Sequence, residues 1–182
     1  ARRAVREAGT PHQIYGIARF SNPAHREALA SVGVRTVPCE LLDRDAVDRL
    51  PQVENVIFMV GRKFGTRGAE AATWATNVSV PDHVAYHYRQ SRLAVFSTGC
   101  VYPLVPVDSG GCTEATPPDP VGEYAQSCLG RERVFGYWSD VWQTPMCFVR
   151  LNYAIDLRYG VLYDIGTRVN AGEPIDLTVS HF

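Results

Sequence analysis

The apolar run Leu93-Ala-Val-Phe-Ser97 and the residues that follow it decide the fold class. Short, largely apolar runs of this kind are typical of strands that are buried on both faces of a sheet. The run leads into a connection over 99–122, which is rich in proline and glycine, and then into helical spacing from Glu123 to about Trp138. Long connections within a compact domain are usually functional, so we expect a site where this strand ends.

The same pattern continues on both sides of this stretch. Four further apolar runs are expected to be strands, over 13–18, 34–40, 55–60 and 146–150. Helical segments are predicted over 23–32, 43–50, 69–90 and 165–171, with Pro81 interrupting the third of them. The alternation predicts an α/β fold, a doubly wound parallel sheet with helices on both faces. In such sheets a ligand binds beyond the carboxyl ends of the strands.

The two ends of the chain read as interrupted elements. Residues 1–9 resemble the second half of an amphipathic helix, and 175–179 the start of a strand. No signal-peptide core is visible. Both ends therefore look cut, and we expect this sequence to be a fragment of a longer chain.

Composition narrows the class of protein. The 182 residues are 46% hydrophobic and 20% charged, with a net charge of −1, which is typical of a soluble globular chain. No concentrated basic face suggests nucleic acid or an anionic membrane as partner, and no apolar run reaches the ~20 residues of a membrane span. The five cysteines are too scattered for a zinc knuckle, and reduced thiols in the cytoplasm are the better interpretation.

Four motifs follow one another along the second half of the chain. They are Phe96-Ser-Thr-Gly-Cys-Val-Tyr-Pro103, Thr113-Glu-Ala-Thr-Pro-Pro118, Glu123-Tyr-Ala-Gln-Ser-Cys-Leu-Gly-Arg-Glu132 and Phe148-Val-Arg-Leu-Asn152. With Asn77 in the long predicted helix, they resemble the NAD(P)-dependent epimerase/dehydratase family of extended short-chain dehydrogenases. The resemblance implies a Rossmann-like domain over 1–152, lacking its first strand, and the start of a substrate-binding lobe over 153–182.

The resemblance also implies site residues. Tyr124 would be the base that takes a proton from a sugar hydroxyl, Thr98 would hold the reacting oxygen, and Asn77 would support the helix geometry. Cys100 and Asn152 would face the substrate. The positions that would bind the cofactor are Arg19, Ser21, Glu40, Leu41, Met59, Val60, Gly61, Tyr124 and Leu151. A basic residue such as Arg19 after the second family strand favours NADP over NAD.

The chain departs from the family pattern in two ways. The glycine-rich phosphate fingerprint is not in this sequence and would precede Ala1. In addition, Cys128 occupies the position of the catalytic lysine, four residues after Tyr124. A free tyrosine has a pKa of ~10, and a neighbouring cation commonly lowers it by ~1–3 units, whereas a neutral thiol lowers it not at all.

Two arginines are candidates to replace the missing charge. Arg131 follows Tyr124 by seven residues, about two helical turns, and Arg133 lies close by. If the fold binds cofactor productively, Cys128→Lys is expected to raise turnover. Three outcomes remain: a slow enzyme, an enzyme with a relocated cation, or a binding protein descended from one.

Several residues also have plainer interpretations. Tyr124 could be a packing residue, Cys128 a small buried hydrophobe and Arg19 a solvated loop residue. His83 and His87 have metal-ligand spacing but no visible third ligand, so a surface helix face is the better interpretation. An aromatic cluster reads as core or interface: Tyr137, Trp138 and Trp142.

Two functions from different classes follow. The first is an NAD(P)-dependent epimerase or dehydratase that acts on a nucleotide-linked sugar, and the second is a redox-silent NAD(P)-binding module. A chain that binds nothing, for want of the phosphate loop, is a third reading. The resemblance implies a homodimer through the helices over 69–90 and 123–138.

Overall fold

The computed structural model describes Glu7, Gly9 and residues 12–63, 65–152 and 160–175. The helix expected over 1–9 and the strand expected over 175–179 lie almost wholly outside these residues. The chain divides into two compact units, residues 1–52 and 53–182, each of which is described by itself.

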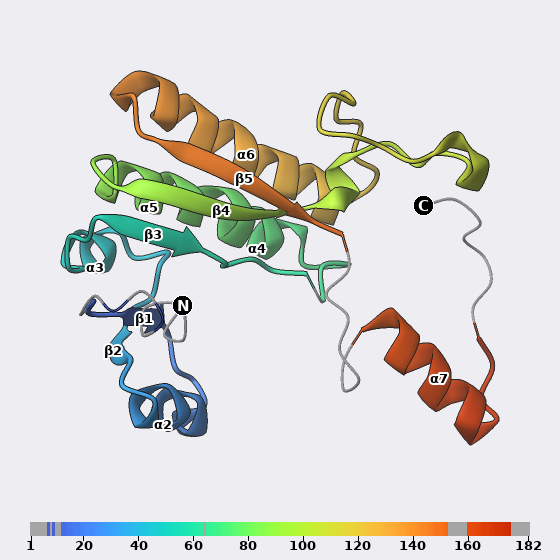
Figure 1. The fold of residues 1–182 in the computed structure, drawn as a ribbon, viewed down its shortest axis with the longest axis horizontal. Coiled ribbons are helices and arrows are strands. Elements are labelled where there is room, and N and C mark those ends of the chain that lie inside the picture. Colours follow the sequence, from blue (N-terminus) through green and yellow to red (C-terminus); the bar gives the residue numbers. More distant parts are fainter. Residues whose placement is uncertain (1–6, 8, 10–11, 64, 153–159, 176–182) are drawn as a thin grey trace. The chain divides into compact units, whose positions relative to one another are not determined.

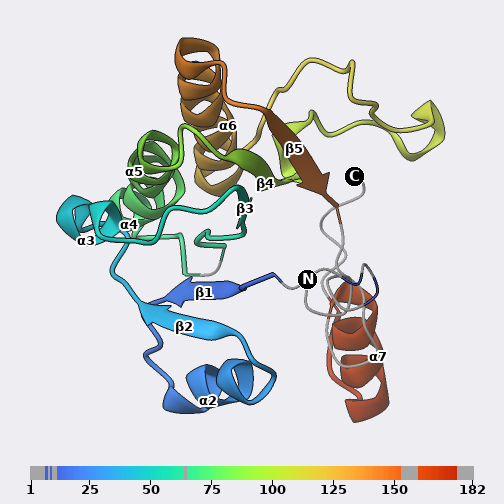
Figure 2. The ribbon, with the colours of Figure 1, turned by 60° about the vertical axis from the view of Figure 1, so that its left-hand side comes forward.

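The first unit contains a strand-helix-strand element (Figure 2). Strands β1 (Tyr15–Ala18) and β2 (Arg35–Pro38) pair in parallel through helix α2 (Pro23–Ser31). The start of α2 follows from its sequence, because the Asn22 side chain accepts from Ala24 N at 3.0 Å and proline stands in the first turn. Asp43 caps the short helix α3 (Arg44–Asp48) in the same way.

The second unit is built on a three-stranded parallel sheet in the order β3-β4-β5 (Figure 1). Its strands are β3 (Asn55–Phe58), β4 (Arg92–Thr98) and β5 (Met146–Leu151). Helices α4 (Glu70–Trp74), α5 (Val80–His87) and α6 (Glu123–Trp142) lie against one face. Helix α7 (Val161–Ala171) starts four residues before the predicted helix.

The long helix predicted over 69–90 is interrupted before its proline. A π-helical turn, Ala75–Ser79, separates α4 from α5, and Pro81 lies in the first turn of α5. Proline has no N–H to bond the carbonyl four residues back, and Val80 N–H already bonds Ala75 O, five residues back. The widened turn holds Asn77, which is completely buried.

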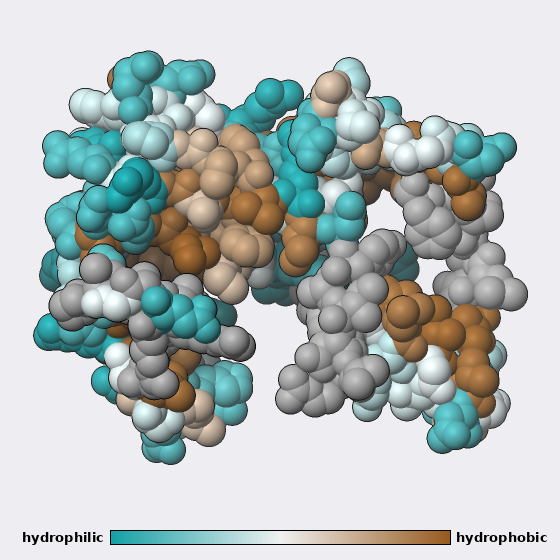
Figure 3. Space-filling view, in the orientation of Figure 1, coloured by the Kyte–Doolittle hydropathy of each residue, from teal (hydrophilic) through white to brown (hydrophobic). Residues whose placement is uncertain are grey.

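The core of the second unit lies between the sheet and its helices. Val95 and Phe58, neighbours in the sheet, are 0% and 4% exposed, and the Phe58 ring packs on Phe135 of α6 at 5.0 Å. On the other face the described residues leave apolar side chains such as Ile57 and Val149 exposed. Figure 3 shows an apolar area over the strands of this sheet. Parallel strands joined through helices make the fold Rossmann-like, as the alternation predicted.

Candidate functional site

The structure brings Tyr124 and Thr98 together at the carboxyl end of β4. Thr98 is the last residue of β4, and Tyr124 is the second residue of α6. The two side chains are close enough for Thr98 to act on the pKa of the Tyr124 phenol, and Thr98 Oγ1 accepts from Cys100 N at 3.2 Å. Thr98 is buried and Tyr124 half-buried. The hydroxyl pair therefore lies where a parallel sheet offers its ligand site.

The surroundings of Tyr124 oppose its ionisation. Burial, followed by the charge of Cys128 and a hydrogen bond with it, raises the pKa of Tyr124 to about 12, although the bond from Thr98 acts in the opposite direction. At pH 7 only about one phenol in 10⁵ would then be ionised. Tyr124 in this structure is therefore almost entirely a neutral phenol at pH 7.

Cys128 lies one turn after Tyr124, and its side chain is 1% exposed. Burial raises the pKa of the thiol, while Arg131 and the hydrogen bond with Tyr124 lower it. The raised pKa keeps Cys128 a neutral thiol at pH 7. The position that holds a lysine in the family therefore contributes no charge here.

Asn77 joins three segments of the second unit. Its Oδ1 accepts from Arg62 N at 2.7 Å, and its Nδ2 donates to Arg62 O at 3.1 Å and to Ser127 Oγ at 2.9 Å. A fourth bond comes from Arg131 Nη2, which donates to Oδ1 at 2.9 Å. Asn77 therefore fixes the loop after β3 against helix α6.

Arg131 points into the site, and Arg133 does not. The Arg131 side chain is 5% exposed, whereas Arg133 is exposed to solvent. Arg131 Nη1 donates to Phe96 O at 2.9 Å, and its guanidinium lies 5.8 Å from the centre of the Phe58 ring. Burial lowers the pKa of Arg131, while the charges of Cys128, Tyr124 and Glu132 raise it. Of the two replacement cations suggested by spacing, the structure places Arg131 at the site.

An ion pair that the sequence did not reveal holds the end of β5. Arg150 donates to Glu132 through two bonds, of 3.0 Å and 2.7 Å, and the Glu132 side chain is 5% exposed. These bonds raise the pKa of Arg150, which also lies 4.7 Å from the centre of the Tyr102 ring. Nothing local to the sequence marked Glu132 as the partner of Arg150.

The two expected substrate residues adjoin each other beyond β4 and β5. Asn152 follows β5, and its side chain lies against Gly99, where a Cβ would overlap the Asn152 amide oxygen. Cys100 is exposed in the 3₁₀ turn Gly99–Val101. A side chain at position 99 would therefore displace Asn152.

The positions expected to bind a cofactor fall in both units. In the second unit Met59, Gly61 and Leu151 are exposed at the ends of β3 and β5, so a dinucleotide has access to them, and Val60 between them is partly exposed. In the first unit Arg19 and Glu40 follow the two strands and pair at 3.8 Å, with side chains 71% and 49% exposed.

Ser21 and Leu41 complete the cofactor set of the first unit. Ser21 is exposed, and Leu41 is buried. The exposed carboxylate and guanidinium of the first unit fit a ribose hydroxyl and a phosphate, respectively.

His83 and His87 do not lie on a solvent-exposed face of their helix, contrary to the prediction. His87 is 6% exposed, and its ring packs against Tyr88 at 4.5 Å, because this side of α5 faces the core. Among the described residues no three His, Cys, Asp or Glu side chains are grouped so as to hold a metal ion. Among the residues that the structure describes, no helix has the length and the apolar character of a membrane-spanning segment.

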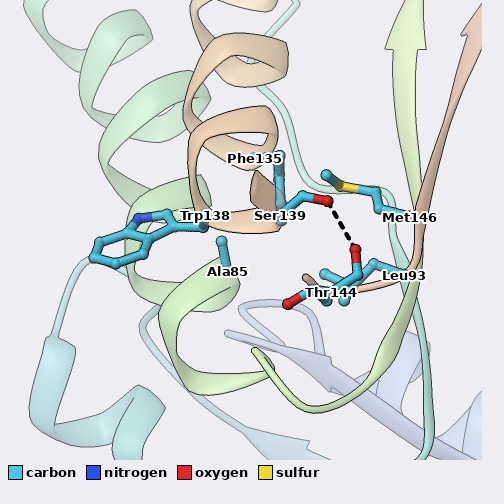
Figure 4. A pocket seen from close by; sticks show the side chains of 7 residues that line it. All are labelled: Ala85, Leu93, Phe135, Trp138, Ser139, Thr144 and Met146. Carbon is cyan, nitrogen blue, oxygen red and sulfur yellow. Dashed lines mark hydrogen bonds between the residues drawn. The ribbon is translucent and has the colours of Figure 1, made fainter. Parts of the chain in front are cut away.

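A hollow elsewhere in the second unit is structural (Figure 4). It lies near the carboxyl end of α6, far along the helix from Tyr124, and its wall includes Phe135, Trp138 and Met146. Ser139 Oγ closes one side by donating to Thr144 O at 2.7 Å. The lining carries no ionisable group that could serve chemistry.

Comparison with known proteins gives the family. The model of the NAD dependent epimerase/dehydratase family matches residues 2–155, whereas no curated protein matches the chain. Among solved structures, WbmG of Bordetella bronchiseptica in complex with NAD is 21% identical with a TM-score of 0.74, over 96% of this chain and 57% of that one.

Two epimerase structures give the same picture. UDP-glucuronic acid 4-epimerase of Bacillus cereus in complex with NAD is 14% identical with a TM-score of 0.74, over 95% of this chain and 60% of that one. The UDP-Glc/GlcNAc 4-epimerase of Campylobacter jejuni is 17% identical with a TM-score of 0.74, over 95% and 59%. The chain thus spans little more than half the length of these proteins. With the family match over residues 2–155 and this fold, the chain belongs to the NAD dependent epimerase/dehydratase family.

Proposed function

We propose that this chain is part of an NAD(P)-dependent epimerase- or dehydratase-like oxidoreductase that acts on a nucleotide-linked sugar. The neighbouring hydroxyls of Tyr124 and Thr98 at the end of β4 carry the proposal. Solved relatives in complex with NAD, and with UDP or UDP-glucose, support the choice of ligands.

The chemistry asks for one proton transfer at Tyr124. Thr98 donates a hydrogen bond to the reacting sugar oxygen, and the ionised Tyr124 oxygen takes the proton from that hydroxyl as it becomes a carbonyl. If a nicotinamide cofactor is bound at this site, it would supply the redox chemistry as a hydride acceptor. Asn77 keeps α6 and the loop after β3 in place, so that the two hydroxyls stay aligned.

The raised pKa of Tyr124 makes this a slow enzyme. A phenol with a pKa of about 12 is ionised about a hundredfold less often at pH 7 than a free tyrosine. The positive charge of an oxidised nicotinamide beside the phenol would recover part of that deficit.

The ligand assignments complete the proposal. Residues 1–152 form the NAD(P)-binding domain, and residues 153–182 begin the substrate lobe. Arg19 favours the 2′-phosphate of NADP, but its pairing with Glu40 leaves a carboxylate there that suits the 2′-hydroxyl of NAD. Exposed aromatic residues on α4 and α6 support a homodimer through these helices: Trp74, Tyr137 and Trp142.

Cofactor titration followed by turnover tests this function. Binding is measured by quenching of tryptophan fluorescence with NAD and with NADP. Reduction is then followed by the near-ultraviolet absorbance of the reduced nicotinamide, with UDP- and dTDP-linked sugars as substrates. We expect slow reduction that Tyr124→Phe abolishes while cofactor affinity is kept. Tyr137→Phe, an exposed tyrosine on the same helix, is the matched control. Reduction that survives Tyr124→Phe would exclude the mechanism.

The raised pKa of Tyr124 also favours a second candidate, a redox-silent NAD(P)-binding module. Such a module binds the cofactor but reduces none of it with any sugar, even at high pH, where a phenolate enzyme gains rate. The pH dependence of reduction therefore separates the two functions.

A further inference from the structure

Three side chains lie on one face of α6. Tyr124, Cys128 and Arg131 are spaced by four and three residues, so successive members stand about one turn apart. Cys128 and Arg131 are 1% and 5% exposed. The face is therefore a short buried row that begins at the phenol and ends at a guanidinium.

The guanidinium reaches back along this row towards the phenol. Side chains on a helix lean towards its amino end, and Arg131 donates to Phe96 O, two residues before Thr98 on β4. Its other amino group bonds Asn77 Oδ1. Arg131 is close enough to both Cys128 and Tyr124 for their ionised forms to raise its pKa, and Cys128 has the larger effect.

The surroundings leave room for this cation and for little else. A Cβ at Gly61 would lie 2.5 Å from Arg131 Nη2, so the guanidinium fills the space that the glycine leaves open. Within the described residues Arg131 Nε is buried without a hydrogen-bond partner. The site thus accepts a desolvated charge at position 131 and holds it by two fixed acceptors.

We propose that Arg131 is the cation of this site, and that positions 128 and 131 are coupled, so that the site accommodates a buried cation at either of them but not at both. The family's lysine at position 128 and Arg131 are then two alternative ways to place one positive charge near Tyr124. The part that Arg131 plays beside Tyr124 rests on the proposed function, whereas the coupling of the two positions does not.

The physical reason is the repulsion of like charges in a poorly solvated space. A lysine at 128 would place an ammonium one turn from a guanidinium that is already desolvated. A neutral thiol avoids this repulsion, and its small volume leaves the guanidinium its place. Cys128→Lys alone is therefore expected to weaken the fold and not to raise turnover, contrary to the expectation from the family resemblance.

A double-mutant cycle tests the coupling. Urea unfolding is measured for Cys128→Lys, Arg131→Met and the double variant. We expect each single change to lower the urea midpoint of unfolding. We expect the equilibrium constant for unfolding of the double variant to be at least tenfold smaller than the value predicted by combining the two single effects. Arg133→Met replaces an exposed arginine on the same helix and should combine additively with Cys128→Lys. Additive behaviour of Cys128→Lys with Arg131→Met would overturn the proposal.

If the Arg131→Met variant does not fold, a second comparison tests the coupling. With Arg131 intact, Cys128→Met and Cys128→Lys introduce unbranched side chains of similar size, and only lysine adds a charge. We expect Lys to raise the equilibrium constant for unfolding at least tenfold more than Met does. Equal effects of Met and Lys would contradict the coupling.

The role of the cation beside the phenol needs a spectroscopic readout. A fluorinated tyrosine at position 124 ionises in a milder pH range, and its absorbance reports its pKa. The groups that act on it are Cys128, Cys100 and Thr98, with Arg131 beyond them. Arg131→Met should raise that pKa by about one unit, Arg131→Lys should restore most of it, and Arg133→Met should leave it unchanged. No shift on Arg131→Met would end this part of the proposal, whether or not the chain turns over a sugar.

Discussion

Asn77→Ala is the most informative single change in this fold. The substitution removes a completely buried side chain that makes four hydrogen bonds, two with the backbone of Arg62, one with Ser127 and one with Arg131. It leaves the π-helical turn of the backbone otherwise intact. The loss therefore measures how strongly the loop after β3 is held to α6.

The magnitude follows from what each partner loses. Arg131 Nη2 loses its bond to Oδ1 in a buried site, which costs about 1.5–3 kcal/mol for a charged donor. Ser127 still donates to Tyr124 O at 2.8 Å, and the backbone of Arg62 can form hydrogen bonds with water instead. The two bonds of Asn77 with Arg62 and its bond with Ser127 therefore contribute about 0.5–1 kcal/mol each. Together they predict a loss of about 3–6 kcal/mol in the free energy of unfolding.

Urea unfolding followed by circular dichroism gives this quantity. Thr76→Ala is the matched control, because Thr76 neighbours Asn77 and makes a single bond, from its Oγ1 to Ala72 O at 2.9 Å. We expect the control to lose less than about 1 kcal/mol. A loss for Asn77→Ala no larger than that of the control would refute the idea that this side chain holds the site together.

Three further outcomes are expected. Glu132→Gln removes the charge that faces Arg150 in a largely buried pair and should lower the free energy of unfolding by about 2–4 kcal/mol; an unchanged melting temperature would contradict this. Folding raises the pKa of Tyr124 from 10.0 to about 12, so the unfolded chain loses the phenol proton at a lower pH than the folded chain does. The free energy of unfolding should therefore fall between pH 10 and about 12 in the wild type, and should fall less in Tyr124→Phe. If the urea midpoints of the two proteins change in parallel across that range, the phenol of Tyr124 is not buried as described. Arg19→Ala should weaken binding of NADP about tenfold more than that of NAD in a fluorescence titration; an equal loss for both cofactors would remove Arg19 from the phosphate site.

Much of the architecture could be predicted because it is local. The apolar run at 93–97 became β4, Arg92–Thr98, and the cap and proline at Asn22 and Pro23 began α2. Pro81 correctly predicted an interruption of the helix, but the widened turn lies before it. The reason is that proline has no N–H, so the carbonyl one turn earlier loses its usual hydrogen-bond donor. His87 was misjudged because helical spacing alone does not say which face of a helix meets the core.

By itself the sequence determined the order of strands and helices and the common face of Tyr124, Cys128 and Arg131, since helical rise and apolar periodicity act over a few residues. Only the tertiary structure decided that Arg131 bonds Asn77, 54 residues away, and that Arg150 pairs with Glu132, 18 residues away. The physical reason is that a hydrogen bond has a range of about 3 Å, so its partners are chosen by how the elements pack and not by their spacing along the chain.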